Sequence, residues 1–349
     1  MLQPLKYIYK NLLPIERVTL LYGLFTTLLL FVWWGELNHP LQQLQERGAI
    51  LLVMVLLFVA HLRKPIASVR FLRNLFPLAL ISYWYPDIYE FCSLLPNLDP
   101  VFAGADQALF GCQPSLEFSR TFSSGLWSEL FHMGYFAYYP MIFLTVLLTL
   151  VLDKARFEEY GFIVLTAFLL YYAIYLFVPV AGPQYYFQAI GQEAAEAGNF
   201  YDIGNYFRTH LEMRPSPGPE GFFRSCVEAA QAGGERPQAA FPSSHVGVST
   251  VLMILLFRLR KWLCAAVFPF YFFLCCATVY IEAHYLIDVI GGLISAVIFY
   301  WCAKTLFDRA CRSSVCYVAT LLQQSEPTLP DQRASSPPNR KLPPIQGRR

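Results

Sequence analysis

Charge is scarce in this 349-residue sequence. Asp, Glu, Lys and Arg together make up 14% of it, against about 25% in an ordinary soluble domain. Hydrophobic residues make up 56% and aromatic residues 17%, more apolar material than the surface of a soluble fold can cover with polar groups. The composition therefore excludes an ordinary soluble domain. The net charge of only +2 gives no reason to expect a nucleic-acid partner.

The nine cysteines follow neither the paired spacing of a zinc motif nor a disulfide framework. Four of them lie inside apolar runs, where a thiol packs as a small hydrophobic group: Cys264, Cys275, Cys276 and Cys302. Cys112 and Cys226 lie in connections that we place on the extracytoplasmic side, where a disulfide is chemically permitted. Their spacing leaves open whether these two thiols meet.

What the sequence has instead is a series of apolar runs near the length that crosses a bilayer, roughly 20 residues. The runs predict eight spans, at 18–34, 48–62, 74–92, 130–152, 160–180, 243–257, 262–281 and 285–303. They are continuously apolar, without the alternation of membrane strands, so we expect helices. No small-residue cleavage site follows the first run, which is expected to remain as a helix. The predicted fold class is an all-α integral membrane bundle of about eight helices.

Basic residues distinguish the two ends of these spans. Twelve of them lie on one side: Lys6, Lys10, Arg17, Arg63, Lys64, Arg70, Arg73, Lys154, Arg156, Arg258, Arg260 and Lys261. The two short connections on the other side contain only Arg47 and Arg120. Because short basic loops stay in the cytoplasm, both termini are expected there.

Two long polar segments divide the chain. Residues 181–242 are rich in Gly, Pro, Ala and charges, and predict an extracytoplasmic loop that acts as a lid or a substrate-binding element. Residues 313–349 are rich in Pro, Ser, Gln and Arg, and predict a disordered cytoplasmic tail. We therefore expect N-terminal transmembrane helices at 1–92, a second membrane domain at 93–312, and the tail.

The first chemical motif is Phe241-Pro242-Ser243-Ser244-His245, at the start of an apolar helix. Ser243 or Ser244 can cap this helix, whose first N–H groups and positive dipole end suit an anion. A plain helix cap beside an interfacial histidine explains the same residues.

The second motif places His284 and Asp288 four residues apart, and hence on one helix face. An aspartate in an apolar span costs about 2.5 to 3.5 kcal/mol on insertion scales, so it requires a partner or a polar cavity. His284 is the obvious one, because a carboxylate that accepts from one imidazole nitrogen leaves the other nucleophilic. The basic turn 258–261 between the two helices places His245 and His284 at the same face of the membrane.

Together these motifs resemble those of the type 2 phosphatidic acid phosphatase superfamily. Its Pro-Ser-Gly-His motif is matched by 242–245, with Ser244 in place of Gly, and its final His and Asp are matched by His284 and Asp288. The resemblance covers roughly the last six helices, and implies a six-helix catalytic core (93–312) preceded by two N-terminal helices. It also implies metal-independent chemistry without a cofactor. A metal site is disfavoured because no fourth ligand is evident.

The resemblance implies a role for each matched residue. His284 would be the nucleophile that becomes phosphohistidine, Asp288 would orient it, and His245 would protonate the leaving oxygen. Ser243 and Ser244 would bind the phosphoryl group.

The chain also departs from the family pattern. Ala277-Thr278 stand where the family usually has Ser-Arg, and its first motif, a Lys followed seven residues later by Arg-Pro, has no match. Residues 179–186 and the stretch 106–111, with Pro114 beyond it, look more like the branch that contains inositol phosphorylceramide synthase. Members of that branch transfer a phospho-head group to a lipid alcohol.

With these basic residues missing, phosphate contacts must come from elsewhere, because a phosphoryl centre needs donors for its oxygens. The candidates lie in the long loop: Gln184, Arg208, Arg214, Arg224 and Arg236. Each arginine is also explained as a solvated surface charge, and Gln184 as a helix-end residue.

We therefore predict a membrane lipid phosphate phosphatase acting through phosphohistidine on a phosphorylated lipid of the bilayer. A phospho-head-group transferase resembling inositol phosphorylceramide synthase is the first alternative, since only the attacking group differs. A non-enzymatic transporter with Asp288 and the histidines as a polar relay is the second. Against it, these residues gather at one face, whereas transporter sites lie near the midplane.

Overall fold

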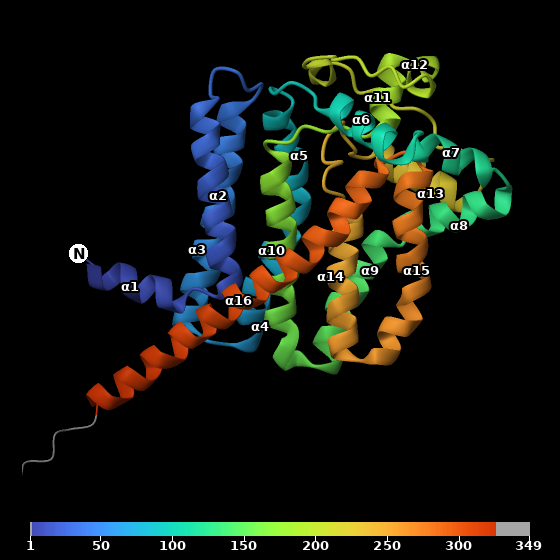
Figure 1. The fold of residues 1–349 in the computed structure, drawn as a ribbon. Coiled ribbons are helices and arrows are strands. Elements are labelled where there is room, and N and C mark those ends of the chain that lie inside the picture. The colour runs from blue at the N-terminus through green and yellow to red at the C-terminus, as the bar shows by residue number, and fades with distance from the viewer. Residues whose placement is uncertain (1, 326–349) are drawn as a thin grey trace, which may run out of the picture.

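The computed structural model describes residues 2–325, and in this part of the chain all regular structure is helical (Figure 1). Among the described residues, five helices are long and apolar enough to cross a membrane: α2 (Pro14–Val32), α3 (Pro40–Arg63), α10 (Phe157–Tyr175), α15 (Lys261–Tyr280) and α16 (Leu286–Ser325), the last through its part Leu286–Arg312. A sixth span forms if α8 (Gly125–Phe136) and α9 (Tyr138–Leu152), bent by 44° at their junction, are counted together. The prediction of an all-α membrane bundle is confirmed.

The count of eight spans stays a prediction, because two of the predicted runs give shorter helices. The run 74–92 is divided at Leu80 into α4 (Ala67–Ala79) and α5 (Ile81–Cys92), and α14 (Ser244–Leu259) is a shorter apolar helix. α16 continues to Ser325, past residue 312, where the disordered tail was predicted to begin. The rest of that predicted tail, 326–349, lies outside the described residues.

Buried ion pairs hold the N-terminal helices together. The described part of the chain begins with the short helix α1 (Leu2–Asn11). Glu16, at the start of α2, accepts two hydrogen bonds from Arg73 of α4, at 2.7 and 2.6 Å, and Arg73 is only 1% exposed. Arg47 of α3 pairs with Asp87 of α5 at 2.7 Å, where both side chains are buried. Losing one partner of such a pair costs about 3 to 5 kcal/mol, because the other charge is left buried and unpaired. These pairs explain how charged residues are accommodated in otherwise apolar helices.

α10 occupies the centre of the bundle and contacts α2, α5, α9, α14 and α16. Tyr171 of α10 donates to or accepts from Ser295 of α16 at 2.8 Å, and lies directly against Gly247 of α14. A Cβ at Gly247 would overlap the Tyr171 hydroxyl, so glycine allows α10 and α14 to approach this closely. This three-helix junction fixes the positions of α14 and α16, which begin at the two histidine motifs. The 3₁₀ turn η1 (Lys154–Arg156) connects α9 to α10.

The predicted loop 181–242 contains helices of its own: α11 (Pro183–Ile190), α12 (Gln192–Glu196), η2 (Tyr206–Arg208) and α13 (Phe222–Ala232). α11 and α12 gather with α6 (Asp99–Phe110) and α7 (Pro114–Thr121) over one end of the bundle (Figure 1). α13 packs on α8, where the Glu129 carboxylate accepts the N–H groups of Phe223 and Arg224 at 3.0 and 3.2 Å. The loop is thus a folded cap over this end.

Candidate active site

His284 lies in the short connection 281–285 between α15 and α16. Its Nδ1 is 2.8 Å from the carbonyl oxygen of Ala240. A carbonyl can only accept, so Nδ1 carries the proton and Nε2 keeps its lone pair. Asp288 Oδ2 is farther from Nδ1, at 3.6 Å, and accepts the backbone N–H of Tyr285 at 2.9 Å. The main chain, more than the carboxylate expected from the sequence, sets the tautomer of His284.

The free Nε2 atom of His284 faces the second histidine. It lies 3.4 Å from Nδ1 of His245, whose ring stacks on Tyr135 at 4.8 Å and packs beside Tyr138 at 4.4 Å between ring centroids. His284 is only 3% exposed, and burial lowers its pKa to about 4, against a smaller opposing effect of the Ala240 carbonyl. His284 is therefore neutral near pH 7, the form in which imidazole is a nucleophile.

Two aspartates of α6 hold the chain around His284. Asp106 accepts the N–H groups of Leu286 and Ile287 at 2.8 and 3.0 Å, and so caps α16. Asp99 accepts the N–H groups of Ala181 and Gly182, at 2.7 and 2.8 Å. It also accepts the Tyr285 hydroxyl, at 2.9 Å. Burial raises the pKa of both carboxyls, and these hydrogen bonds oppose the rise.

Neither aspartate was predicted as a site residue. Asp106 begins the stretch 106–111, which was noted only for its similarity to the inositol phosphorylceramide synthase branch, and Asp99 belongs to no motif.

Replacing Asp99 with alanine is expected to lower the free energy of unfolding by about 3 kcal/mol or more, since four buried donors lose this acceptor: the N–H groups of Ala181 and Gly182, the Tyr285 hydroxyl and the Asn97 amide. It should also reduce activity by displacing His284. Thermal melting in detergent measures the first effect and lipid turnover the second. Asp202→Ala is the matched control, because Asp202 is exposed in the cap and accepts the Gly204 N–H. Equal melting temperatures for the two variants would contradict the assignment.

Backbone contacts join the segments around His284 directly. Gly182 adopts φ +95°, and a Cβ there would strike the carbonyl oxygen of Ala283. Gln184 N–H donates to the Glu282 carbonyl at 2.7 Å, and Ala240 N–H donates to Val180 at 2.9 Å. Glycine at 182 therefore permits the close approach of the loop to the histidine connection.

A family model of the PAP2 superfamily matches residues 104–302, more than half of the chain and including His245, His284 and Asp288. The chain belongs to the PAP2 superfamily. Its function is accordingly of the phosphatase or phosphotransferase type. The match does not select the inositol phosphorylceramide synthase-like branch. No curated protein and no solved structure matches this chain.

The two serines of the PAP2 motif serve first as helix-start groups. The Oγ of Ser243 accepts the N–H of Val246 at 3.4 Å, and Ser243 N–H donates to the Asp288 carbonyl at 3.0 Å. Ser244 N–H donates to the Tyr175 hydroxyl at 3.0 Å. Some of the N–H groups at the start of α14, which the sequence analysis expected to bind an anion, are therefore already hydrogen-bonded within the protein.

Of the four loop arginines, Arg214 contacts the segment that carries His284. It forms an ion pair at 3.0 Å with Glu282, two residues before the histidine, and also bonds Gln192 at 3.1 Å. Glu282 is buried, which raises its pKa to about 7, while Arg214 opposes the rise. This carboxyl is therefore partly protonated near neutral pH, so its hold on Arg214 is weaker than that of an ordinary carboxylate.

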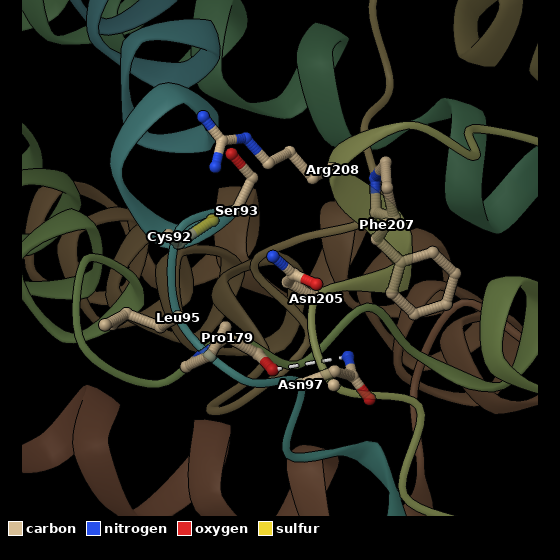
Figure 2. A pocket seen from close by; sticks show the side chains of 10 residues that line it. Cys92, Ser93, Leu95, Asn97, Pro179, Asn205, Phe207 and Arg208 are labelled. Carbon is tan, nitrogen blue, oxygen red and sulfur yellow. Dashed lines mark hydrogen bonds between the residues drawn. The ribbon is translucent and has the colours of Figure 1, made fainter. Parts of the chain in front are cut away.

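The other arginines are engaged elsewhere. Arg224 pairs with Glu228 at 2.9 Å and also bonds the Gly218 carbonyl, and Arg236 bonds the Glu235 carbonyl at 3.0 Å. Arg208 donates to the Glu36 carbonyl, at 2.8 Å, in the connection between α2 and α3. Figure 2 shows it beside Ser93, at a small cavity that Asn97 and Phe207 also line. Arg208 thus ties the cap to the N-terminal helices.

Gln184 is buried in a polar cluster that the sequence did not predict. Its Oε1 accepts from Gln231 at 3.2 Å, and its Nε2 donates to Glu235 at 3.3 Å. Burial raises the pKa of Glu235 to about 7, against the opposing effect of the two amides. Only Gln184 was identified in advance, because the other two residues belong to no motif.

Cys112 and Cys226, for which a disulfide was left open, are both free. Within residues 2–325, no group of three or more His, Cys, Asp or Glu side chains is arranged to hold a metal ion.

Proposed function

We propose that this PAP2 superfamily member removes a phosphoryl group from a membrane lipid phosphate ester through a phosphohistidine at His284. The observation that carries the proposal is the orientation of the His284 ring. Its Nδ1–H donates to the Ala240 carbonyl, so the unprotonated Nε2 atom faces His245, 3.4 Å from Nδ1 of that ring. A neutral, oriented imidazole beside a second titratable ring is what covalent catalysis with proton transfer requires.

The reaction has two steps. In the first, His284 Nε2 bonds to phosphorus as the P–O ester bond breaks, and His245, in its imidazolium form, gives a proton to the leaving alcohol and becomes neutral. In the second, water attacks phosphorus, His245 takes the water proton, and the P–N bond breaks. Asp288, 3.6 Å from the His284 ring, stabilises the positive charge that the ring acquires in the intermediate.

Recognition of the phosphate is assigned to Arg214. Its guanidinium pairs with Glu282 beside His284, and a phosphate dianion would replace this weakly held carboxyl with two parallel N–H···O bonds. Substrate entry also requires the two histidine rings to separate, because at 3.4 Å they leave no room for phosphorus between them. The cap formed by 181–242 is the element expected to move.

We place the site on the extracytoplasmic side, with both termini in the cytoplasm. The cap lies at one end of the bundle (Figure 1), and the basic turns 63–64 and 258–261 lie between helices at the other. The substrate is then a phosphorylated lipid of the outer or lumenal leaflet.

Transfer to a lipid alcohol is a second candidate. It is favoured by Ala277-Thr278 in place of the usual Ser-Arg pair. It is also favoured by the burial of His284, which limits the access of water to the intermediate.

Product analysis separates the two reactions. Purified protein is incubated with labelled phosphatidic acid, prenyl diphosphate or phosphatidylinositol, each with and without ceramide. Release of free phosphate, independent of ceramide, is expected from the hydrolase, and a new ceramide-dependent phospholipid from the transferase. Absence of turnover, together with transport across sealed vesicles, would replace both with the transporter hypothesis.

A further inference from the structure

A groove lies between the first two membrane helices, away from the histidines. It has a volume of about 480 Å³, and its walls are α2 and α3 with α5 behind them. Its lining includes Thr19, Gly23, Gly48, Met54, Arg47 and Trp84. A volume of this size is within the range of small-molecule sites in proteins, about 300 to 1,000 Å³.

The groove opens sideways from the bundle. Leu24 of α2 and Leu51 of α3 form its rims and are 58% and 51% exposed, whereas Trp84 at its floor is 1% exposed. Both wall helices are candidate membrane spans with most of their surface outside the protein core. The medium that reaches the groove is therefore lipid hydrocarbon.

Most polar groups of the lining are bonded within the protein, while Arg47 Nε and Trp84 Nε1 are buried without a hydrogen-bond partner among the described residues. Thr19 and Thr27 donate their hydroxyls to carbonyls of their own helix, at 2.8 and 2.6 Å, and so present methyl groups. Arg47 is held by both carboxylate oxygens of Asp87, at 3.0 and 2.7 Å. Because Arg47 Nε and Trp84 Nε1 are buried, the groove presents mainly apolar surface to an occupant.

The dimensions select a single hydrocarbon chain. Along α3 the lining extends from Leu44 to Met54, roughly 15 Å at the rise of a helix. This is about half of the hydrocarbon thickness of a bilayer, hence the depth of one leaflet.

We propose that this groove binds one acyl chain of a membrane lipid. The proposal does not depend on the proposed reaction. It does place the lipid against α5, whose Tyr85 carbonyl accepts from Gln238 at 3.0 Å. Gln238 precedes by two residues the carbonyl that holds His284. The bound chain thus supports the helix on which the catalytic segment rests.

The test uses the full-length protein in nanodiscs that contain a phosphatidylcholine with a photoactivatable diazirine in one acyl chain. Cross-linked residues are mapped by mass spectrometry. We expect the strongest cross-links at the groove lining, and about a tenfold lower yield there in Gly48→Phe, which corresponds to about 1.4 kcal/mol of binding free energy. A Cβ at Gly48 meets nothing within 4 Å, so the added ring can enter the groove without striking the protein.

Two variants of the same helix are the controls. Gly48→Ala raises helix propensity without filling the groove, and Leu52→Phe adds a ring at an exposed position outside the lining. Both should keep the wild-type yield. If Gly48→Phe fails to fold, Gly23→Val fills the groove from α2, where a Cβ makes ordinary contact with Trp84. An even spread of cross-links over all lipid-facing helices, or an unchanged yield in a folded groove-filling variant, overturns the proposal.

Discussion

Replacing His284 with alanine is expected to reduce turnover of the lipid substrate by about 10⁴-fold or more, the scale on which loss of a catalytic nucleophile is felt. The reason is that no other described group offers a lone pair at the position of Nε2 beside His245. Turnover is followed as label released from, or exchanged between, radiolabelled lipids. The covalent step is followed separately as acid-labile, base-stable label on the protein after rapid quenching.

His210→Ala is the matched control for this experiment. His210 is exposed and stacks on Tyr206 in the cap, 4.0 Å between ring centroids, so its loss should leave turnover near the wild-type level. Unimpaired labelling of the His284→Ala protein would remove His284 as the nucleophile. Turnover without any trapped label in the wild type would instead favour direct attack by water.

His245→Ala is expected to lower turnover by about 10² to 10⁴-fold, the usual contribution of a positioned general acid or base. The loss should depend on the leaving group, because a proton donor matters most when the departing oxygen is a strong base. A lipid alkyl phosphate should show the full loss. A nitrophenyl phosphate ester, whose leaving group departs without a proton, should form the labelled intermediate almost as fast as in the wild type.

Tyr138→Phe is the matched control, because it tests whether the neighbouring hydroxyl contributes to the role of His245. It keeps an aromatic ring against His245, at the 4.4 Å found for Tyr138, and removes only the hydroxyl. Its turnover should stay within a few-fold of the wild type. If His245→Ala slowed both esters to the same extent, His245 would be a positioning residue and not the acid.

Features that depend on local sequence were predictable. Apolar runs of bilayer length give α2, α3, α10, α15 and α16, because hydrophobic length is read from adjacent residues. The sequence placed His245 and His284 at the same face of the membrane by a similarly short argument, two neighbouring helices joined by one basic turn, but the 3.4 Å approach of the two rings comes from the structure. The division of the run 74–92 into two helices was harder to predict. Proline usually marks a helix break, but Pro77 and Pro86 both lie inside helices and the break falls at Leu80.

Features that depend on distant contacts were not predictable. The carbonyl that holds His284 is 44 residues away in sequence, and Asp106 is 180 residues from the N–H of Leu286. The periodicity of a helix predicts contacts between residues three or four positions apart, not contacts between residues so far apart in the sequence. The arginines illustrate the same limit: Arg214 and Arg208 look alike in the loop sequence, but one pairs with Glu282 and the other with the α2–α3 connection.

The hydrogen bond between Ala240 and His284 has a consequence for how this site varies during evolution. The acceptor is a main-chain atom, so no side-chain substitution at position 240 can delete it. Small residues can replace one another there while the imidazole keeps its tautomer. Insertion or deletion of a residue between Gln238 and Phe241 would shift the carbonyl out of register with the ring. Position 240 is thus tolerant of side-chain substitution, whereas this segment is intolerant of a change in its length.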